Sequence, residues 1–173
     1  MKSRDIAIVG ILLAIGAILR YFLAMLHTPL TPNMIIAFYC LAIILIHPKI
    51  HEALGIGIVA GVLSMLISSS MFPPGNLVSE PLGALACFGL YAVLKGKTGS
   101  PGVTTFVTTL VSGFSWVAVS LIAVSFGFAA LKTTMIGYMT VFVPIVVVTA
   151  IFNAIIVQIL FYPSSRALMR GTE

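Results

Sequence analysis

Charged residues are scarce in this chain of 173 residues: only 8% of its residues are charged, against roughly 25% in a typical soluble domain. Apolar residues make up 60%, so too few polar side chains are present to cover a surface in water. The same composition excludes a disordered chain, because disorder requires few apolar residues and many charges. Soluble globular proteins and disordered proteins are therefore both excluded.

Cysteine is scarce as well. Cys40 and Cys87 lie in apolar runs and are typical of small core residues, so no disulfide is expected. The apolar runs are long and continuous, whereas the strands of a transmembrane β-barrel are short and alternate. The remaining class is an all-α polytopic membrane protein, here a single membrane domain over residues 1–173.

Six apolar stretches, separated by polar turns or turns rich in Pro and Gly, predict a bundle of six transmembrane helices. A span usually needs about 20 residues and at least about 17, so the second and fourth stretches are short. Length favours six spans over four spans with two re-entrant segments. The predicted spans are residues 6–26, 33–46, 53–71, 77–94, 103–130 and 135–162.

Basic residues are distributed unevenly over the loops between these spans. Six spans place both termini on one side, and seven basic residues share that side, whereas Lys132 lies in a loop on the other side. Because cytoplasmic loops are enriched in Lys and Arg, we expect a multi-pass cell-membrane protein with both termini cytoplasmic. The net charge of +5 then reflects orientation in the lipid bilayer, and no nucleic-acid partner is expected. The seven residues are Lys2, Arg4, Lys49, Lys95, Lys97, Arg166 and Arg170.

Motifs for catalysis, nucleotide binding and metal binding are missing from the sequence. Gly96-Lys97-Thr98 resembles the end of a phosphate-binding loop, but Tyr91 stands where that motif needs a glycine. His47 and His51 have the spacing of two metal ligands on a helix, but no further ligands converge on them, which favours a solvated interfacial pair. We therefore expect no enzyme, no metal, no cofactor and no coupling to ATP by this chain alone.

Two charged residues lie near or inside apolar stretches. Arg20 follows Arg4 by 16 residues, which places it about 24 Å further along a helix, near the outer edge of the hydrocarbon. Glu80 begins the fourth stretch, at a similar depth. Because a charge in the membrane costs about 2.5–3.5 kcal/mol, one interpretation is an outward-facing zwitterion site in which Glu80 binds an ammonium and Arg20 a carboxylate. The alternative is that Arg20 extends to the headgroups and Glu80 is merely interfacial.

Three further residues are candidates for the same site. Asn76 precedes Glu80 by four residues and shares its helical face, although capping of the fourth helix explains it equally well. Trp116 lies in mid-span, where an indole either stacks on an aromatic ligand or fills the core. Asn153 lies deep in the sixth span, where an amide also serves to link helices.

Pairs of small residues spaced by four occur in two helices. Gly10 with Ala14, and Gly57 with Gly61, have the pattern that lets helix backbones approach closely in lipid. The neighbour of each pair is either another helix of this chain or a helix of a partner subunit.

The arrangement of the chain resembles the substrate-binding S components of energy-coupling-factor (ECF) transporters. The first helix contains the small-residue segment Gly10-Ile11-Leu12-Leu13-Ala14-Ile15-Gly16-Ala17. The second helix opens with Pro32-Asn33-Met34, and the fourth opens with Pro74-Gly75-Asn76-Leu77-Val78-Ser79-Glu80-Pro81, which look like the tryptophan-transporter branch. The resemblance covers most of residues 1–162.

This resemblance implies a subunit that captures a small nutrient, here tryptophan, in an outward pocket. It also implies docking on a transmembrane T subunit driven by two ATPase subunits, with Gly10 and Ala14 at the positions that contact the T subunit. Gly10 stands where the family more often has alanine, a change that preserves close approach. The family's pocket is associated with outer loops and helices four to six. This location fits Arg20 less well than it fits four other residues: Asn76, Glu80, Trp116 and Asn153.

Two other functions remain open from the sequence. A stand-alone carrier for small solutes would use Arg20 and Glu80 as a gate and would need a polar path through the inner half, where few polar residues besides Asn153 occur. A structural or assembly subunit of a membrane complex would need Asn76 and Glu80 for stability and not for ligand affinity.

Overall fold

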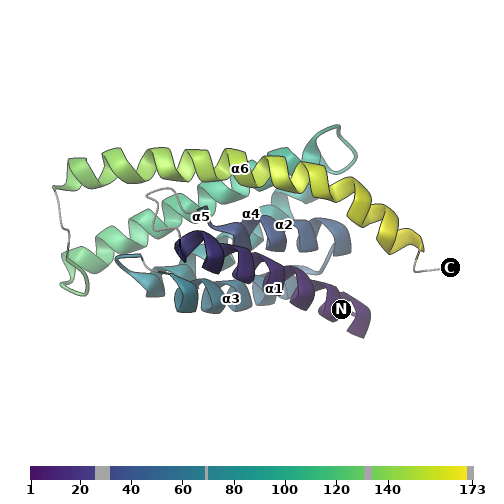
Figure 1. Cartoon of the computed structure of the whole chain (residues 1–173), viewed down its shortest axis with the longest axis horizontal. Helices are drawn as coiled ribbons and strands as arrows, with labels where there is room; N and C mark the ends of the chain where they lie inside the picture. Colours follow the sequence, from purple (N-terminus) through teal and green to yellow (C-terminus); the bar gives the residue numbers. More distant parts are fainter. Residues whose placement is uncertain (26–31, 69, 131–133, 171–173) are drawn as a thin grey trace.

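The computed structural model describes residues 1–25, 32–68, 70–130 and 134–170. Within these residues it has six α-helices, one 3-10 turn and no strand, which confirms the predicted all-α, six-helix bundle (Figure 1). The elements are α1 (Ser3–Met25), α2 (Met34–Ile46), α3 (Ile50–Ile67), η1 (Pro73–Gly75), α4 (Asn76–Leu94), α5 (Ser100–Ser125) and α6 (Met135–Arg170).

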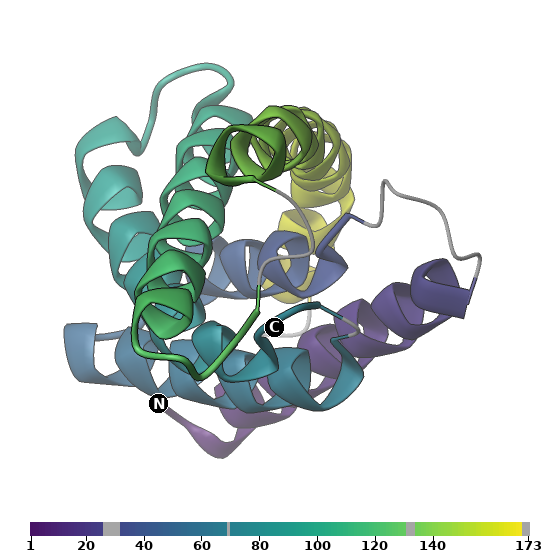
Figure 2. The same cartoon turned by 90° about the vertical axis from the view of Figure 1, so that its left-hand side faces the viewer.

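Five helices form an open ring around α2 (Figure 2). Around the ring, α1 packs on α3, α3 on α4, α4 on α5, and α5 on α6. Among the described residues α6 and α1 do not pack backbone against backbone, so the ring is open between them, and α2 contacts both from the inside. At one end Arg4 Nη2 donates to the carbonyl oxygen of Leu168 (2.7 Å), which ties the start of α1 to the end of α6.

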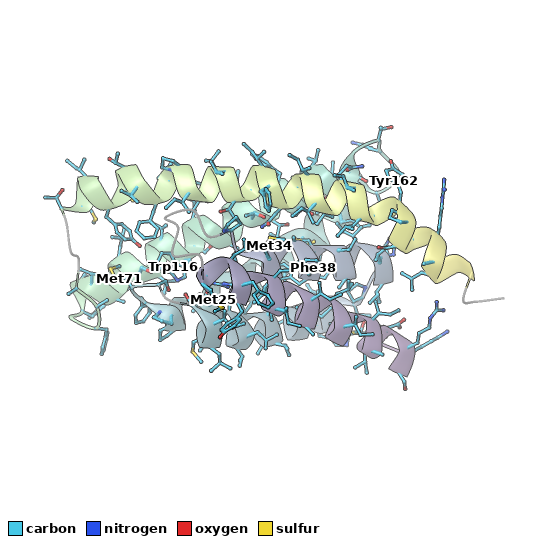
Figure 3. The ribbon with its side chains drawn as sticks, viewed as in Figure 1. Met25, Met34, Phe38, Met71, Trp116 and Tyr162 are labelled. Carbon is cyan, nitrogen blue, oxygen red and sulfur yellow. The ribbon has the colours of Figure 1, made fainter. Side chains whose placement is uncertain are left out.

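Large apolar side chains cover the outside of this ring. Leu66 on α3, Val93 on α4 and Ile136 on α6 are more than 70% exposed, and exposed apolar side chains continue along α6 to Tyr162 (Figure 3). Soluble monomers rarely expose contiguous apolar surface of this extent. Five helices, all except α2, are long and apolar enough to cross a bilayer. The fold is that of a polytopic membrane bundle, as the composition predicts.

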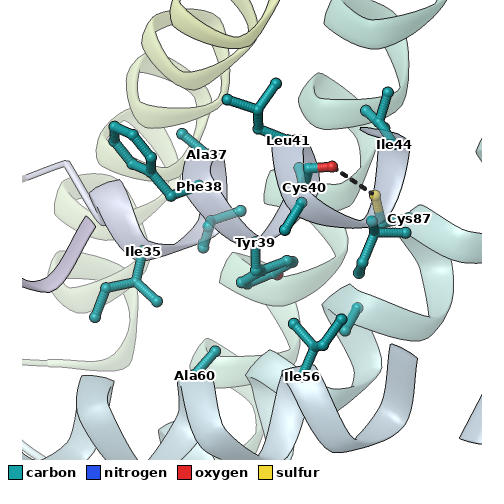
Figure 4. Close-up of a cluster of buried hydrophobic side chains, with 14 of the residues drawn as sticks. Ile35, Ala37, Phe38, Tyr39, Cys40, Leu41, Ile44, Ile56, Ala60 and Cys87 are labelled. Atoms are coloured by element: carbon teal, nitrogen blue, oxygen red, sulfur yellow. Dashed lines mark hydrogen bonds between the residues drawn. The ribbon is translucent and has the colours of Figure 1, made fainter. Parts of the chain in front are cut away.

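The second helix is shorter than a membrane span, and the other five helices enclose it. Its sequence, MIIAFYCLAIILI, is apolar on every side, a pattern typical of a fully buried helix. Each of residues 34–44 is at most 5% exposed, and α2 contacts all five other helices. Figure 4 shows its side chains beside Ile56 and Ala60 of α3 and Cys87 of α4. A helix that other helices shield from lipid is not held to the thickness of the hydrocarbon core, so 13 residues suffice.

The two pairs of small residues have different neighbours. A Cβ atom added at Gly57 would lie 2.7 Å from the Pro81 Cα atom, and one added at Gly61 would lie 2.8 Å from the Asn76 carbonyl oxygen. These glycines therefore let α3 and α4 pack closely within the chain. On α1, Gly10 is exposed and an added Cβ would meet nothing within 4 Å. Ala14 is exposed on the same helix.

This difference predicts opposite effects of two equal substitutions. Gly57→Ala is expected to lower the free energy of unfolding by about 1–3 kcal/mol, because α3 and α4 must separate to admit the methyl group. Gly10→Ala is its matched control and is expected to leave stability unchanged or slightly raised, since alanine favours helix. Thermal unfolding of both variants in detergent measures the difference, and equal midpoints would contradict the α3–α4 packing described here.

The start of α1 and the end of α6 lie at the same end of the bundle (Figure 1). The N-terminal ammonium of Met1 pairs with Glu52 at the start of α3, in addition to the contact between Arg4 and Leu168. The α2–α3 and α4–α5 junctions lie at this end as well. The basic positions 2, 4, 49, 95, 97, 166 and 170 all belong to these segments, whereas Lys132 lies outside the described residues.

The C-terminal ends of α5 and α6 differ from the ends of the fifth and sixth predicted spans. α5 ends at Ser125 and not at Ala130, because Gly127 adopts a left-handed φ of 77° and the Phe128 N–H donates to the Ala123 carbonyl (2.8 Å). This is a glycine-terminated helix end. α6 continues beyond Tyr162, the end of the sixth predicted span, to Arg170.

Candidate binding site

A cavity of about 360 Å³ lies at the end of the bundle opposite the chain termini. Its walls come from the last turns of α1 and α3, the first turns of α2 and α4, the middle of α5 (residues 109–116) and residues 141–149 of α6. Trp116 in Figure 3 marks this end of the bundle. The volume falls near the lower limit of small-molecule sites, which range over roughly 300–1,000 Å³. The cavity can therefore hold one compact organic solute.

Glu80 is the buried anion of this cavity. It lies in the second turn of α4 and is 1% exposed. Its Oε1 atom accepts from Asn33 Nδ2 (2.5 Å) and Ser64 Oγ (3.3 Å), and its Oε2 atom accepts from Ser112 Oγ (3.0 Å). Donors from the start of α2, from α3 and from α5 thus hold one carboxylate in a fixed orientation, as a buried charge requires.

Arg20 supplies the positive charge of the cavity. It lies on α1 and interacts electrostatically with Glu80, yet no ion pair within 4.0 Å joins these two described side chains. Its Nη1 atom is buried and has no hydrogen-bond partner among the described residues. A cation and an anion that line one cavity without direct contact leave room for a ligand between them. In a medium of low dielectric both charges act strongly on such a ligand.

Trp116 forms an aromatic wall with residues of α6. Its indole Nε1 donates to the Phe72 carbonyl oxygen (3.3 Å), and its ring centroid lies 5.6 Å from that of Phe142. Phe142 in turn stacks on Tyr138 at 4.3 Å. A Cβ atom at Gly75 would lie 3.0 Å from the indole nitrogen, so glycine lets η1 approach the ring. Trp116 therefore both packs in the bundle and lines the cavity, which combines the two interpretations of the sequence.

The two predicted asparagines are placed differently. Asn76 lines the cavity and its Nδ2 atom donates to the Pro73 carbonyl oxygen (2.8 Å), which closes the 3-10 turn. Asn153 is fully buried and is not among the cavity residues. Its Nδ2 atom donates to the Asn33 carbonyl oxygen (3.2 Å) and to Thr109 Oγ1 (3.4 Å), so it links α6 to α2 and α5.

Of the five predicted site residues, the structure brings four to the cavity wall: Arg20, Asn76, Glu80 and Trp116. Sequence reasoning missed Asn33, Ser79 and Ser112, which also line the cavity beside Glu80. For Ser112 a signal exists, because Ser or Thr recurs every four residues at positions 100, 104, 108 and 112 of α5, a polar stripe on an apolar helix. Asn33 and Ser79 lie in the two segments that carry the family resemblance, but no spacing of polar residues marks either of them as a site residue.

Comparisons with known proteins agree with a transport function. The family model described as "Tryptophan transporter TrpP" matches residues 2–170. The chain is 30% identical over 180 residues to the "Probable tryptophan transport protein" of Bacillus subtilis (strain 168), a match that covers 100% of this chain and 96% of that protein. No solved structure matches the chain significantly.

These matches extend over nearly the whole chain and confirm the predicted tryptophan-transporter branch. They agree with the exposed apolar surface of the five long helices, which places the chain in a membrane. The chain therefore belongs to the tryptophan transporter TrpP family, and it is a multi-pass membrane transport protein rather than an enzyme.

Proposed function

We propose that this chain is the substrate-binding subunit of an ATP-driven ECF-type importer and captures L-tryptophan on the outer side of the cell membrane. The observation that carries the proposal is the cavity itself, in which Arg20 and Glu80 line the wall without pairing and Trp116 lies beside them. Tryptophan combines an ammonium, a carboxylate and an indole. The cavity offers an anion, a cation and an aromatic face for these three groups.

In the proposed pose the substrate ammonium binds Glu80 and its carboxylate binds Arg20. An Arg–carboxylate contact is among the stronger hydrogen-bonded pairs because both partners are charged. The indole then lies against the Trp116 and Phe142 rings, whose centroids are 5.6 Å apart. Asn76 completes the cavity wall near η1. Asn153 lies behind the wall and holds Asn33 through a hydrogen bond to its backbone carbonyl.

The proposed orientation follows from the charges. The end of the bundle that carries the chain termini also carries the basic positions of the α2–α3 and α4–α5 junctions. If this end is cytoplasmic, as the positive-inside rule indicates, the cavity opens to the outside. The whole chain, residues 1–173, then forms one membrane domain with six helices and both termini in the cytoplasm.

The energy for import comes, in this proposal, from partner subunits. Gly96-Lys97-Thr98 lacks the upstream glycine of a phosphate-binding loop, so the chain offers no nucleotide motif of its own. A transmembrane T subunit with two ATPase subunits would supply it. Gly10 and Ala14 are exposed on α1, where they leave space for a helix of the T subunit to approach closely.

A ligand series tests the capture step. Purified protein in detergent is expected to be stabilised by L-tryptophan, by about 2.7 kcal/mol at 100 times its dissociation constant. Tryptamine lacks the carboxylate and indole-3-propionate lacks the ammonium, so each is expected to bind at least about ten-fold more weakly. Thermal shift and isothermal titration calorimetry measure both effects. Folded protein that no tryptophan analogue stabilises would contradict the proposal and favour an assembly subunit.

A further inference from the structure

We propose that Asn33 and Ser79 complete, with Glu80, a three-acceptor site for the substrate's ammonium, so that the cavity selects primary amines over N-methylated ones. The inference rests on the proposed function and names the residues that recognise one end of its substrate. It follows from counting donors and acceptors around Glu80.

Three hydrogen bonds occupy most of the acceptor positions of the Glu80 carboxylate. Two carboxylate oxygens offer about four lone-pair positions for hydrogen bonds. Asn33 and Ser64 occupy two positions on Oε1, and Ser112 occupies one on Oε2. The remaining position is on Oε2; the buried Tyr39 hydroxyl also interacts with this carboxylate but has no hydrogen-bond partner among the described residues, and Glu80 lines the cavity.

Asn33 presents a second acceptor beside it. Its Nδ2 atom donates to Glu80 at 2.5 Å, which orients the side-chain amide, and its backbone carbonyl accepts from Asn153, which holds the backbone. Its Oδ1 atom is buried and has no partner among the described residues. Asn33 lines the cavity, and we assign this oxygen as the second acceptor for a ligand there.

Ser79 presents the third acceptor. It is 1% exposed, lines the cavity and is the chain neighbour of Glu80. A helical serine or threonine often donates to the carbonyl four residues earlier, as Thr105 and Thr109 do in α5 (2.9 and 2.8 Å). The Ser79 hydroxyl makes no such bond and has no partner among the described residues.

The number of open acceptors matches a primary ammonium, which has three N–H donors. A buried polar group without a partner is costly, so acceptors on the wall of one cavity favour a ligand that satisfies them. The unpartnered Arg20 Nη1 atom on the same cavity wall is a donor and suits the carboxylate end instead. Each methyl group on the substrate nitrogen removes one donor and leaves one acceptor unsatisfied.

The test compares L-tryptophan with α-N-methyl-L-tryptophan by titration calorimetry on the full chain in detergent. Wild-type protein is expected to bind the methylated ligand at least about ten-fold more weakly, because one charged hydrogen bond is lost. Ser79→Ala is expected to weaken tryptophan binding about ten-fold and to reduce the methylation penalty to less than about three-fold, since the acceptor and its donor belong to one interaction. Asn33→Ala is expected to reduce the methylation penalty as well. This penalty is the ratio of the two dissociation constants, so it does not depend on the fraction of folded protein.

Thr104→Val is the matched control, because the Thr104 hydroxyl is also buried without a described partner but lies outside the cavity. It should change neither affinity nor the methylation penalty. Ser79→Ala should melt no lower than the wild type without ligand. A Ser79→Ala variant that binds both ligands like the wild type, or loses the same factor for both, would overturn the ammonium site. Wild-type protein that binds no tryptophan would overturn the proposed function itself, before any variant is compared.

Discussion

Glu80→Gln is expected to reduce the affinity for L-tryptophan by at least about 30-fold, the largest effect of any single substitution in the cavity. Removing one charge from a buried, hydrogen-bonded pair costs about 2–5 kcal/mol, and each 1.4 kcal/mol is ten-fold in affinity. Glutamine keeps the size of the side chain and can still accept from Ser112 or Asn33. The loss should therefore appear in ligand affinity much more than in the folding of the unliganded bundle.

Analogue binding separates this charge effect from a general disturbance of the cavity. Indole-3-propionate has no ammonium, so its affinity should change by less than about three-fold in Glu80→Gln, because the lost interaction was never made. Glu52→Gln, which removes an acid at the opposite end of the bundle, is the control and should leave tryptophan binding unchanged. Retained tryptophan affinity in a less stable Glu80→Gln variant would instead support a structural role for Glu80.

The sequence predicts the two charged site residues because a charged side chain is costly to place in a membrane. Arg20 and Glu80 interrupt apolar stretches, and both line the same cavity in the structure. Depth along a helix was sufficient to place them at the same level. The sequence does not predict that they stay unpaired, because that depends on how α1 and α4 are positioned around α2.

Asn33 and Ser79 show what a sequence leaves out. Serine and asparagine are common near helix ends, where capping explains them without any ligand. Their importance comes only from hydrogen bonds they make or lack in three dimensions: Asn33 is fixed by Glu80 and Asn153, and Ser79 has no described partner. Asn153 is the reverse case, since its depth made it a candidate and the structure places it behind the cavity wall.

The central position of α2 could have been predicted from its sequence. An apolar stretch without any polar face is typical of a helix enclosed on all sides, and its shortness agrees with this. Read as a span, the same stretch is merely too short. The structure removes that difficulty, because α2 contacts five helices and presents almost no surface to lipid.

A double variant with Gly10→Leu and Ala14→Leu is expected to stop tryptophan uptake while leaving tryptophan binding intact. Both residues are exposed on α1, and a Cβ at Gly10 meets nothing within 4 Å, so the bundle itself tolerates larger side chains there. A helix that docks on this stripe needs close backbone approach, and two leucines would hold it away. In cells that express the chain with a T subunit and its ATPases, uptake of labelled tryptophan should fall at least about ten-fold, as expected when more than 1.4 kcal/mol of docking energy is lost.

Gly89→Leu is the control for this experiment, because Gly89 is equally exposed and open but lies on α4. Uptake and binding should both remain normal in that variant, which separates docking on α1 from a general effect of bulky residues facing lipid. Normal uptake with leucine at Gly10 and Ala14 would exclude α1 as the docking helix. Uptake into vesicles that contain only this chain and no ATP would exclude the importer mechanism and identify a stand-alone carrier, since a subunit that depends on partner ATPases cannot accumulate its substrate alone.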